Sequence, residues 1–315
     1  MRTVDLFSGC GGLSLGFTRA GYNIVAAFDN WDEAIKVYNQ NFEHPIIKLD
    51  INTLNGDYDA IKRFEPEMII GGPPCQDFSS AGKRDEELGR ADLTIEFADV
   101  VTHIHPRWFV MENVSRAPKS QRYQAAIQIF KAAGYGLTLE TVDASYHGVP
   151  QTRKRAFLIG QLGGMDNALL PYLTRKSTPN KMTVRQYWTQ IGKVLDVEHH
   201  YRHPRSYQRR GIFSIDEPSP TVRGVNRPIP PNYQKHHGDT CHPSESVRPL
   251  TTLERSYIQT FPLDFVFSGS KTNLEQMIGN AVPVNLAEFI ANCILEFEED
   301  KASPVFIRGE QLALI

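Results

Sequence analysis

Cysteine is scarce in this sequence. The 315 residues include four cysteines, none of them in a CxxC pair: Cys10, Cys75, Cys241 and Cys293. Such wide spacing excludes a disulfide framework and the common structural zinc sites. The histidine pairs at 199–200 and 236–237 fit no standard zinc spacing either. We therefore expect no metal, and a reactive cysteine has to be recognised by its surroundings.

Long apolar runs are also missing. No stretch approaches the ~18 apolar residues needed to cross a membrane. The N-terminus reaches the acidic Asp5 before an apolar stretch develops, so a secretory signal is not expected. With 41% hydrophobic and 22% charged residues, the composition is that of a globular chain with a core of useful size. The sequence predicts a cytoplasmic protein with no membrane partner.

The net charge is small but unevenly distributed. The whole chain carries a formal charge of -2, whereas residues 171–240 hold twelve Lys/Arg against five Asp/Glu, or +7. A basic segment in an otherwise acidic protein indicates a polyanion bound at one place. A solvated basic face is the alternative interpretation, and charge alone does not decide between the two.

Strand and helix patterns alternate through the first half of the chain. Strands are predicted at 2–7, 24–28, 46–49, 68–70, 108–111, 135–142 and 155–160. Helices are predicted at 13–20, 31–42, 92–104, 121–133 and 285–299. This order predicts an α/β fold in which helices cover both faces of a mostly parallel sheet.

The alternation stops near residue 165. Residues 165–250 are rich in Pro, Arg, His and Tyr and have no sustained period, which indicates a smaller, irregular second domain. A regular apolar face returns at 285–299, and we expect this helix to pack back onto the first domain. The predicted division is 1–163, 164–271 and a returning C-terminal segment, 272–315.

Two loops at strand ends carry candidate chemistry. Asp5–Gly12 (DLFSGCGG) is a glycine loop that could hold a nucleotide-like cofactor, although a plain tight turn is the alternative. Ser14 stands where a dinucleotide fingerprint has its third glycine. In Gly72–Ser79 (GPPCQDFS), two prolines fix Cys75 at the sheet edge where α/β folds bind ligands. A buried structural cysteine is the less favoured interpretation.

The Cys75 loop resembles the catalytic Pro-Cys-Gln loop of the DNA cytosine-5 methyltransferases. The other signatures of that family follow in the same order: Glu112-Asn113-Val114, Gln151-Thr152-Arg153-Lys154-Arg155, Arg248-Pro249-Leu250-Thr251 and Gly279-Asn280-Ala281-Val282-Pro283. The match covers nearly the whole chain except roughly 165–245. It implies a Rossmann-like methyltransferase fold, with a target-recognition domain in the variable region.

The resemblance assigns roles to four catalytic residues. Cys75 would attack C6 of cytosine, and its thiol, with an ordinary pKa of ~8.5, needs activation. Glu112 would hold or protonate N3. Arg153 and Arg155 would orient the adduct and contact O2 and phosphate.

The same resemblance implies S-adenosylmethionine as cofactor. The residues it assigns to that pocket are Phe7, Gly9, Gly11, Asn30, Trp31, Asp50, Pro73, Asn280 and Val282. In the family, the counterpart of Trp31 stacks on adenine and that of Asp50 accepts from its amino group. Asn30 departs from the glutamate that many members use to accept from both ribose hydroxyls, although Asn can still accept one hydrogen bond.

A target base inside a duplex has to flip out to reach the nucleophile. Double-stranded DNA is therefore the expected partner of the basic segment. The predicted DNA-binding residues are Gln76, Ser79, Arg202, Arg205, Arg209, Arg210, Arg223 and Arg227. Arginine commonly reads guanine edges and also contacts phosphates, and the sequence does not assign either role to one arginine.

Three other functions compete with this interpretation. A tRNA cytosine-5 methyltransferase would keep Cys75, Glu112 and Arg153, and the Arg-rich segment favours DNA modestly. A regulator without turnover would be expected to lack the Pro-Cys dipeptide. The incomplete glycine fingerprint counts against a nicotinamide-dependent oxidoreductase. The compact chain suggests a bacterial or phage modification enzyme, monomeric and nucleoid-associated, for which a cognate restriction endonuclease is a candidate partner.

Overall fold

A computed structural model describes residues 1–74, 93–204, 206, 209–243 and 246–302. Four predicted site residues lie outside the described residues: Cys75, Gln76, Ser79 and Arg205. The remaining predicted site residues can be placed in the fold.

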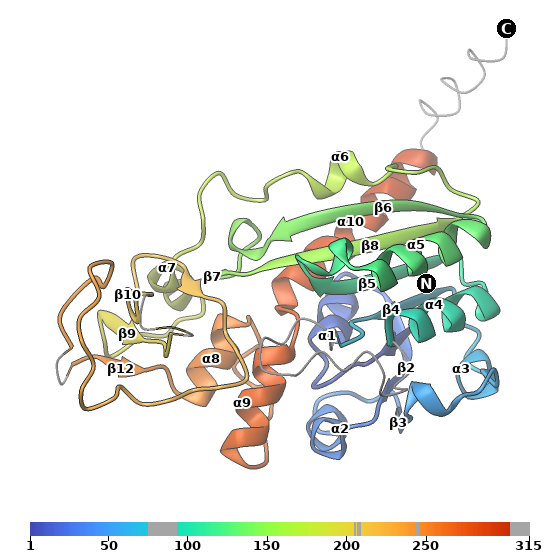
Figure 1. Cartoon of the computed structure of the whole chain (residues 1–315). Helices are drawn as coiled ribbons and strands as arrows, with labels where there is room; N and C mark the ends of the chain where they lie inside the picture. The colour runs from blue at the N-terminus through green and yellow to red at the C-terminus, as the bar shows by residue number, and fades with distance from the viewer. Residues whose placement is uncertain (75–92, 205, 207–208, 244–245, 303–315) are drawn as a thin grey trace, which may run out of the picture.

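A seven-stranded sheet forms the centre of the protein (Figure 1), with the strand order β3-β2-β1-β4-β5-β8-β6. The strands are β1 (Arg2–Leu6), β2 (Asn23–Asp29), β3 (Ile46–Lys48), β4 (Met68–Gly71), β5 (Trp108–Val114), β6 (Tyr135–Asp143) and β8 (Lys154–Leu162). Strands β1 to β5 pair in parallel, and β8 runs antiparallel between β5 and β6. The predicted mostly parallel sheet is confirmed.

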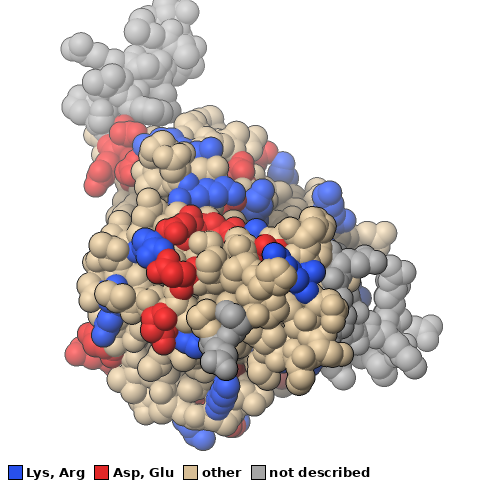
Figure 2. Space-filling view, turned by 90° about the vertical axis from the view of Figure 1, so that its left-hand side faces the viewer, with Lys and Arg blue, Asp and Glu red and all other residues tan. Residues whose placement is uncertain are grey.

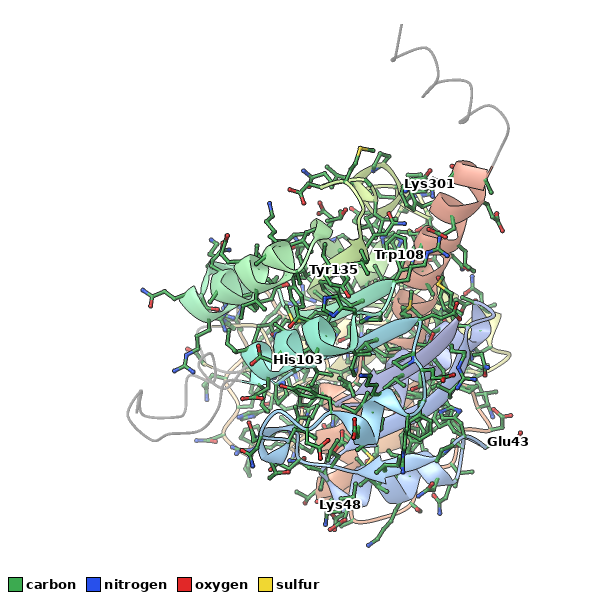
Figure 3. The ribbon with its side chains drawn as sticks, turned by 90° about the vertical axis from the view of Figure 1, so that its right-hand side faces the viewer. Glu43, Lys48, His103, Trp108, Tyr135 and Lys301 are labelled. Carbon is green, nitrogen blue, oxygen red and sulfur yellow. The ribbon has the colours of Figure 1, made fainter. Side chains whose placement is uncertain are left out.

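Successive side chains of each buried strand point to opposite faces of the sheet, so both faces carry apolar side chains. Helices cover both faces. In β4, Met68 and Ile70 join one core cluster and Ile69 joins the other. Helices α1 (Gly12–Arg19), α6 (Leu170–Leu173) and α10 (Val284–Ala302) contribute to the first cluster. Trp108, labelled in Figure 3, belongs to this cluster. Its ring packs edge-on to that of Phe297. Helices α3 (Asp59–Lys62), α4 (Leu93–Ile104) and α5 (Gln121–Ala132) contribute to the second.

Helix α10 returns to the first part of the chain. Its residues Leu286 and Ile290 are fully buried in one cluster with Phe17 of α1, which confirms the predicted packing. By length and composition, the stretch Lys271–Ala302 could cross a membrane, but 61% of its most apolar window is buried inside the protein. That burial is the pattern of a core helix.

The second part of the chain is irregular, as predicted (Figure 1). Its elements are α7 (Val184–Gln190), β9 (His199–Tyr201), β10 (Ile212–Ser214), β11 (Ser219–Pro220), β12 (Arg248–Pro249), α8 (Thr252–Ile258) and α9 (Lys271–Asn280). Strand β11 pairs with β7 (Gln151–Thr152), which directly precedes β8. The apolar cluster of this part also includes Cys10, Val37 and Val284, so it continues into the sheet part without a break.

Candidate active site

The predicted cofactor and catalytic residues gather at one edge of the sheet. Asp50, Asn30, Phe7 and Pro73 follow β3, β2, β1 and β4 within two residues, and Glu112 lies in the last three residues of β5. These strands are neighbours in the sheet and run parallel, so their carboxyl ends meet. This is the edge at which open α/β sheets bind their ligands.

The glycine loop after β1 has an unusual backbone. Phe7 lies in the left-handed region at φ 58°, which a bulky residue rarely adopts, and Gly9 and Gly11 have φ of 54° and 94°. Apart from its chain neighbours, no described residue has an atom within 4 Å of where a Cβ on Gly9 would stand, so the space beside the loop is open with respect to these residues. A strained residue next to open space at a strand end is a feature of ligand-binding loops.

Asp29 fixes this loop, and sequence reasoning missed it. Its carboxylate accepts hydrogen bonds from the Gly9 N–H at 2.7 Å and the Trp31 N–H at 2.8 Å. Burial raises the pKa of Asp29, while the N–H donors oppose that shift. The signal was available, because Asp29 ends β2 one residue before the predicted Asn30. Asp29 therefore joins the β1 and β2 loops into one unit.

The side chains around this unit suit an adenosine group. Trp31 and Asp50 are half-buried, and Asn30 is exposed. The Asp50 Oδ1 accepts from the Asn52 N–H at 3.1 Å, which orients the carboxylate beyond β3. An aromatic ring, an acceptor and an amide at three adjacent strand ends fit stacking on a base and hydrogen bonding to its polar groups.

The α9–α10 junction closes against the glycine loop. A Cβ on Gly12 would lie 2.3 Å from the Val282 carbonyl oxygen, so only glycine permits this approach. The neighbouring Asn280 is exposed, and its Oδ1 accepts from the Gln276 Nε2 at 3.2 Å. The structure thus brings the predicted Asn280 and Val282 to the predicted cofactor loop from the far end of the chain.

Glu112 is a buried carboxyl at the end of β5. Its side chain is 11% exposed, and its Oε1 lies 2.7 Å from the Arg155 Nε in an ion pair. Burial raises the pKa of Glu112, and the positive charges of Arg155 and Arg153 oppose that shift. The Oε2 lies 3.0 Å from where a Cβ on Gly72 would stand, so it faces the start of the Cys75 loop.

Asn113 ties that loop to the sheet. Its Nδ2 donates to the Pro73 carbonyl at 3.1 Å. Pro73 is buried and precedes Cys75 by two residues. A carboxyl that remains neutral to higher pH than usual therefore borders the origin of a thiol-bearing loop.

Arg153 is placed differently from the prediction that it contacts the base and phosphate. Its side chain is 1% exposed, and its guanidinium donates to four backbone carbonyls. The acceptors are Val222 at 3.1 Å, Gly279 at 3.2 Å, Asn280 at 3.3 Å and Ala281 at 2.9 Å. With its terminal nitrogens occupied, Arg153 joins Val222 to the α9–α10 junction. Among the described residues, Arg155 is the one that forms an ion pair with Glu112.

Two buried glutamines extend this junction and were missed from sequence. Gln151 and Gln259 are fully buried, and the Gln151 Nε2 donates to the Gln259 Oε1 at 2.7 Å. The Gln151 Oε1 accepts from the Val222 N–H at 2.8 Å. The Gln259 Nε2 donates to the Ile278 and Ala281 carbonyls at 2.6 and 2.9 Å. Both polar groups of Val222 are therefore bound by buried side chains.

The predicted DNA-binding arginines differ in their surroundings. Arg209 and Arg227 are exposed. Arg210 pairs with Glu217 and stacks on Phe213. The other two described arginines donate to backbone carbonyls, Arg202 to Thr221 and Arg223 to His203. Figure 2 faces this end of the molecule and shows acidic side chains interspersed with basic ones.

The chain as a whole matches a known family. Residues 1–296 match the family described as C-5 cytosine-specific DNA methylase. The chain belongs to this family. As a C-5 cytosine-specific DNA methylase, it transfers a methyl group to C5 of cytosine in DNA, and the family implies S-adenosylmethionine as the methyl donor.

Named relatives support the assignment along most of the sequence. The methylase is 59% identical over 304 residues to the type II methyltransferase M.HindV of Haemophilus influenzae, covering 95% of this chain and 98% of the relative. It is 56% identical over 294 residues to the type II methyltransferase M.HgiDI of Herpetosiphon aurantiacus, covering 93% and 94%.

Solved structures match the fold. A putative DNA modification methyltransferase from an Escherichia coli prophage aligns with a TM-score of 0.69 at 22% identity, covering 95% of this methylase and 99% of that chain. The Dnmt2 methyltransferase of S. pombe aligns with a TM-score of 0.68 at 18% identity, covering 94% and 98%. The predicted Rossmann-like methyltransferase fold is confirmed.

Proposed function

We propose that this methylase modifies a short, specific site in duplex DNA through a covalent bond between Cys75 and C6 of a flipped-out cytosine. The observation that carries the proposal is the position of Glu112, a buried carboxyl facing Gly72 at the start of the Cys75 loop. Asn113 holds the Pro73 carbonyl beside it. This arrangement supports a nucleophile and a proton donor acting on one ring.

The covalent step makes C5 nucleophilic. The Cys75 thiolate forms a bond to C6, and the electrons of the C5–C6 double bond move into the ring, toward N3 and C5. S-adenosylmethionine, when bound, supplies an electrophilic methyl group on a sulfonium sulfur. After C5 takes the methyl group, loss of the C5 proton to a base restores the double bond. The Cys75 sulfur then leaves as thiolate.

Glu112 would control the proton at N3. Its raised pKa keeps the carboxyl protonated over a wider pH range than an exposed glutamate. It can donate to N3 as the adduct forms and take the proton back when Cys75 leaves. Arg155 would orient the Glu112 carboxyl through their ion pair and would contact the base beside it.

The cofactor residues would form a pocket at the ends of β1, β2 and β3. The strained Phe7 backbone and the open space at Gly9 would receive the methionine part. Trp31 would stack on adenine, Asp50 would accept from its amino group, and Asn30 would contact the ribose. The contact between Gly12 and Val282 supports closure of the pocket by the α9–α10 junction.

Residues 164–271 would grip the duplex and read its sequence. Their irregular elements carry the exposed Arg209 and Arg227. Within that proposed range, Leu169 and Leu173 pack in the sheet core, so the start of the segment rests on the catalytic part. We infer a monomer acting in the cytoplasm, where the nucleoid lies. The type II names of the relatives suggest a restriction endonuclease that acts on the same site.

The test is covalent trapping. A duplex with 5-fluorocytosine at the target base should trap the wild-type enzyme, because fluorine cannot leave as the C5 proton does. Cys75→Ser should lose nearly all turnover, and Cys75→Ala should form no adduct on a denaturing gel. Equal adduct formation by Cys75→Ala would refute the assignment. Stronger competition by tRNA than by duplex DNA would favour the tRNA alternative.

A further inference from the structure

A buried ion pair lies directly beneath the recognition segment Thr221–Arg227. Arg255 of α8 and Glu275 of α9 are 6% and 3% exposed and form this pair. Burying two charges costs desolvation free energy, and apolar residues of similar size often stabilise a core equally well. The presence of the pair at this position therefore calls for an explanation other than stability.

Both partners of the pair bind the recognition segment. The Arg255 Nη2 donates to the Arg223 carbonyl. The Glu275 Oε1 accepts from the Asn226 Nδ2 at 3.0 Å and from the Thr252 Oγ1 at 2.8 Å. The Asn226 Nδ2 also donates to the Leu250 carbonyl at 2.8 Å. The segment thus forms one hydrogen bond to each charged partner, through Arg223 to Arg255 and, three residues later, through Asn226 to Glu275.

Close packing against α9 fixes the position of the recognition segment. A Cβ on Gly279 would lie 2.3 Å from the Arg223 carbonyl carbon and the Gly224 nitrogen. The two backbones therefore touch with no room for a side chain between them. On the other side, Gln151 and Arg153 hold the N–H and the carbonyl of Val222. A shift of the segment would break several buried hydrogen bonds at once, so it has one position.

The pair also governs the local charge. Burial, together with the nearby positive charge of Arg223, lowers the pKa of Arg255 to about 10. The Glu275 carboxylate compensates the charge of Arg255.

We propose that Arg255 and Glu275 are positioning residues for target recognition, which fix the Arg223–Asn226 segment so that it reads one position of the DNA site. This inference rests on the proposed role of residues 164–271 in reading DNA. Both residues are buried, and they act through the Arg223 carbonyl and the Asn226 amide. Specificity, rather than the rate of methyl transfer, is the property that they control.

The main experiment replaces the pair with apolar residues of similar size, Arg255→Met with Glu275→Leu. We expect a folded enzyme with unchanged affinity for S-adenosylhomocysteine and a cognate-site rate within a few-fold of wild type. Methylation at sites that differ at one position should rise roughly tenfold or more relative to the cognate site. The measurement is methylation of a random-sequence DNA library, mapped by bisulfite sequencing.

Two further variants separate positioning from charge attraction. Arg255→Glu with Glu275→Arg keeps an ion pair but reverses donor and acceptor toward Arg223 and Asn226. We expect its specificity to be relaxed, as in the apolar double variant. Asn226→Leu leaves the pair intact and removes the contact from the segment side, so it should relax the same position even if the apolar double variant fails to fold. The control Arg107→Met with Glu298→Leu removes an Arg–Glu pair elsewhere and should methylate like wild type.

A library map identical to wild type in the apolar double variant and in Asn226→Leu would overturn the proposal, as would full fidelity in the reversed pair. An equal fall at cognate and near-cognate sites would also overturn it and indicate a structural role. A wild-type protein that methylates no library DNA would instead refute the proposed function, because the inference concerns only which sites are chosen.

Discussion

Glu112 combines two opposing influences on one carboxyl group. Burial raises its pKa, and the guanidinium of Arg155, 2.7 Å away, limits the rise. A carboxyl tuned in this way can lend a proton to N3 and recover it within one turnover. Tyr123 is affected by the same charge, because Glu112 adds to the burial that raises the tyrosine pKa. The protonation of Glu112 is therefore coupled to the charged and titratable side chains around the end of β5.

We predict that Glu112→Gln slows methyl transfer by ~10²-fold or more, the scale of a lost general acid. In wild type, the single-turnover rate should fall as pH rises through the pKa of Glu112, because the proton donor is lost. The glutamine variant should lack this falling limb, since its amide does not titrate. Single-turnover rates at saturating DNA across a pH series test this, and an unchanged rate would exclude the role.

Asn30 allows a prediction in the direction of gain. Asn30 is exposed. The two carboxylate oxygens of the adjacent Asp29 already accept hydrogen bonds from the Gly9 and Trp31 N–H groups. A carboxylate at position 30 can accept from both ribose hydroxyls, as the family glutamate does. Asn30→Glu should bind S-adenosylmethionine at least as tightly as wild type in calorimetry, and Asn30→Leu more weakly. A collapse of binding in Asn30→Glu would show that residue 30 does not face the ribose.

Residue types suggested roles for some site residues, whereas the contacts of others depend on the folded chain. The Pro-Cys dipeptide and the Glu112-Asn113 pair are local patterns, so the sequence alone suggested them. Arg153 was predicted to contact the substrate because it lies in a shared motif. Its actual partners are carbonyls of residues 222 and 279–281, which only the folded chain brings together. Gln151 and Gln259 were missed for the same reason.

The elements follow the sequence pattern more closely than the site does. Each predicted strand and helix of the sheet part is present within a few residues, because alternation and helical periodicity are local. The second part has short strands of two or three residues, with no period to detect. Its order comes from buried polar side chains and from the apolar cluster that it shares with Cys10, Val37 and Val284.

Helix α1 offers a test of the contact that closes the cofactor loop. Alanine is the better helix former by ~1 kcal/mol, but a Cβ on Gly12 would lie 2.3 Å from the Val282 carbonyl. Overpacking of this kind typically costs ~1–3 kcal/mol. Gly12→Ala should therefore weaken S-adenosylhomocysteine binding by roughly tenfold in calorimetry.

Gly16→Ala is the matched control on the same helix. Its Cβ would lie 2.4 Å from the Ala287 Cβ and 2.6 Å from the Val284 carbonyl oxygen, so it would meet α10 and not Val282. It should lower the thermal midpoint without a specific loss of cofactor affinity in the folded protein. Equal cofactor binding by Gly12→Ala and wild type would remove Val282 from the proposed pocket.

At the scale of the whole molecule, charge determines how the protein meets DNA. The excess of +7 at residues 171–240 is partly neutralised by acidic side chains from outside that range, because Arg175 pairs with Glu296 and Lys181 with Asp143. Within the range, Arg210 pairs with Glu217. The exposed Arg209 and Arg227 are the better candidates for phosphate or base contact. Net charge alone would have overstated the basic surface.

We predict that the arginines separate by this criterion. Arg209→Ala and Arg227→Ala should each either weaken all DNA and reduce the salt slope by about 1, or spare non-specific binding and relax one position of the methylated site. Arg210→Ala should leave the salt slope unchanged and lower stability. Binding over a salt series, with methylation mapped for each variant, distinguishes them. Wild-type behaviour of both Arg209→Ala and Arg227→Ala would place the DNA-binding surface elsewhere.

Val222 lies outside any helix or strand, yet both of its peptide groups are bound by buried side chains. Exchange of an amide proton with solvent requires its hydrogen bond to open. The Val222 amide can open only if Gln151 releases it from within the core. In deuterated solvent, this loop amide should then exchange as slowly as those of the central strands. Slow exchange there would mean that the recognition segment is fixed before any DNA arrives, so sequence reading begins on a rigid surface.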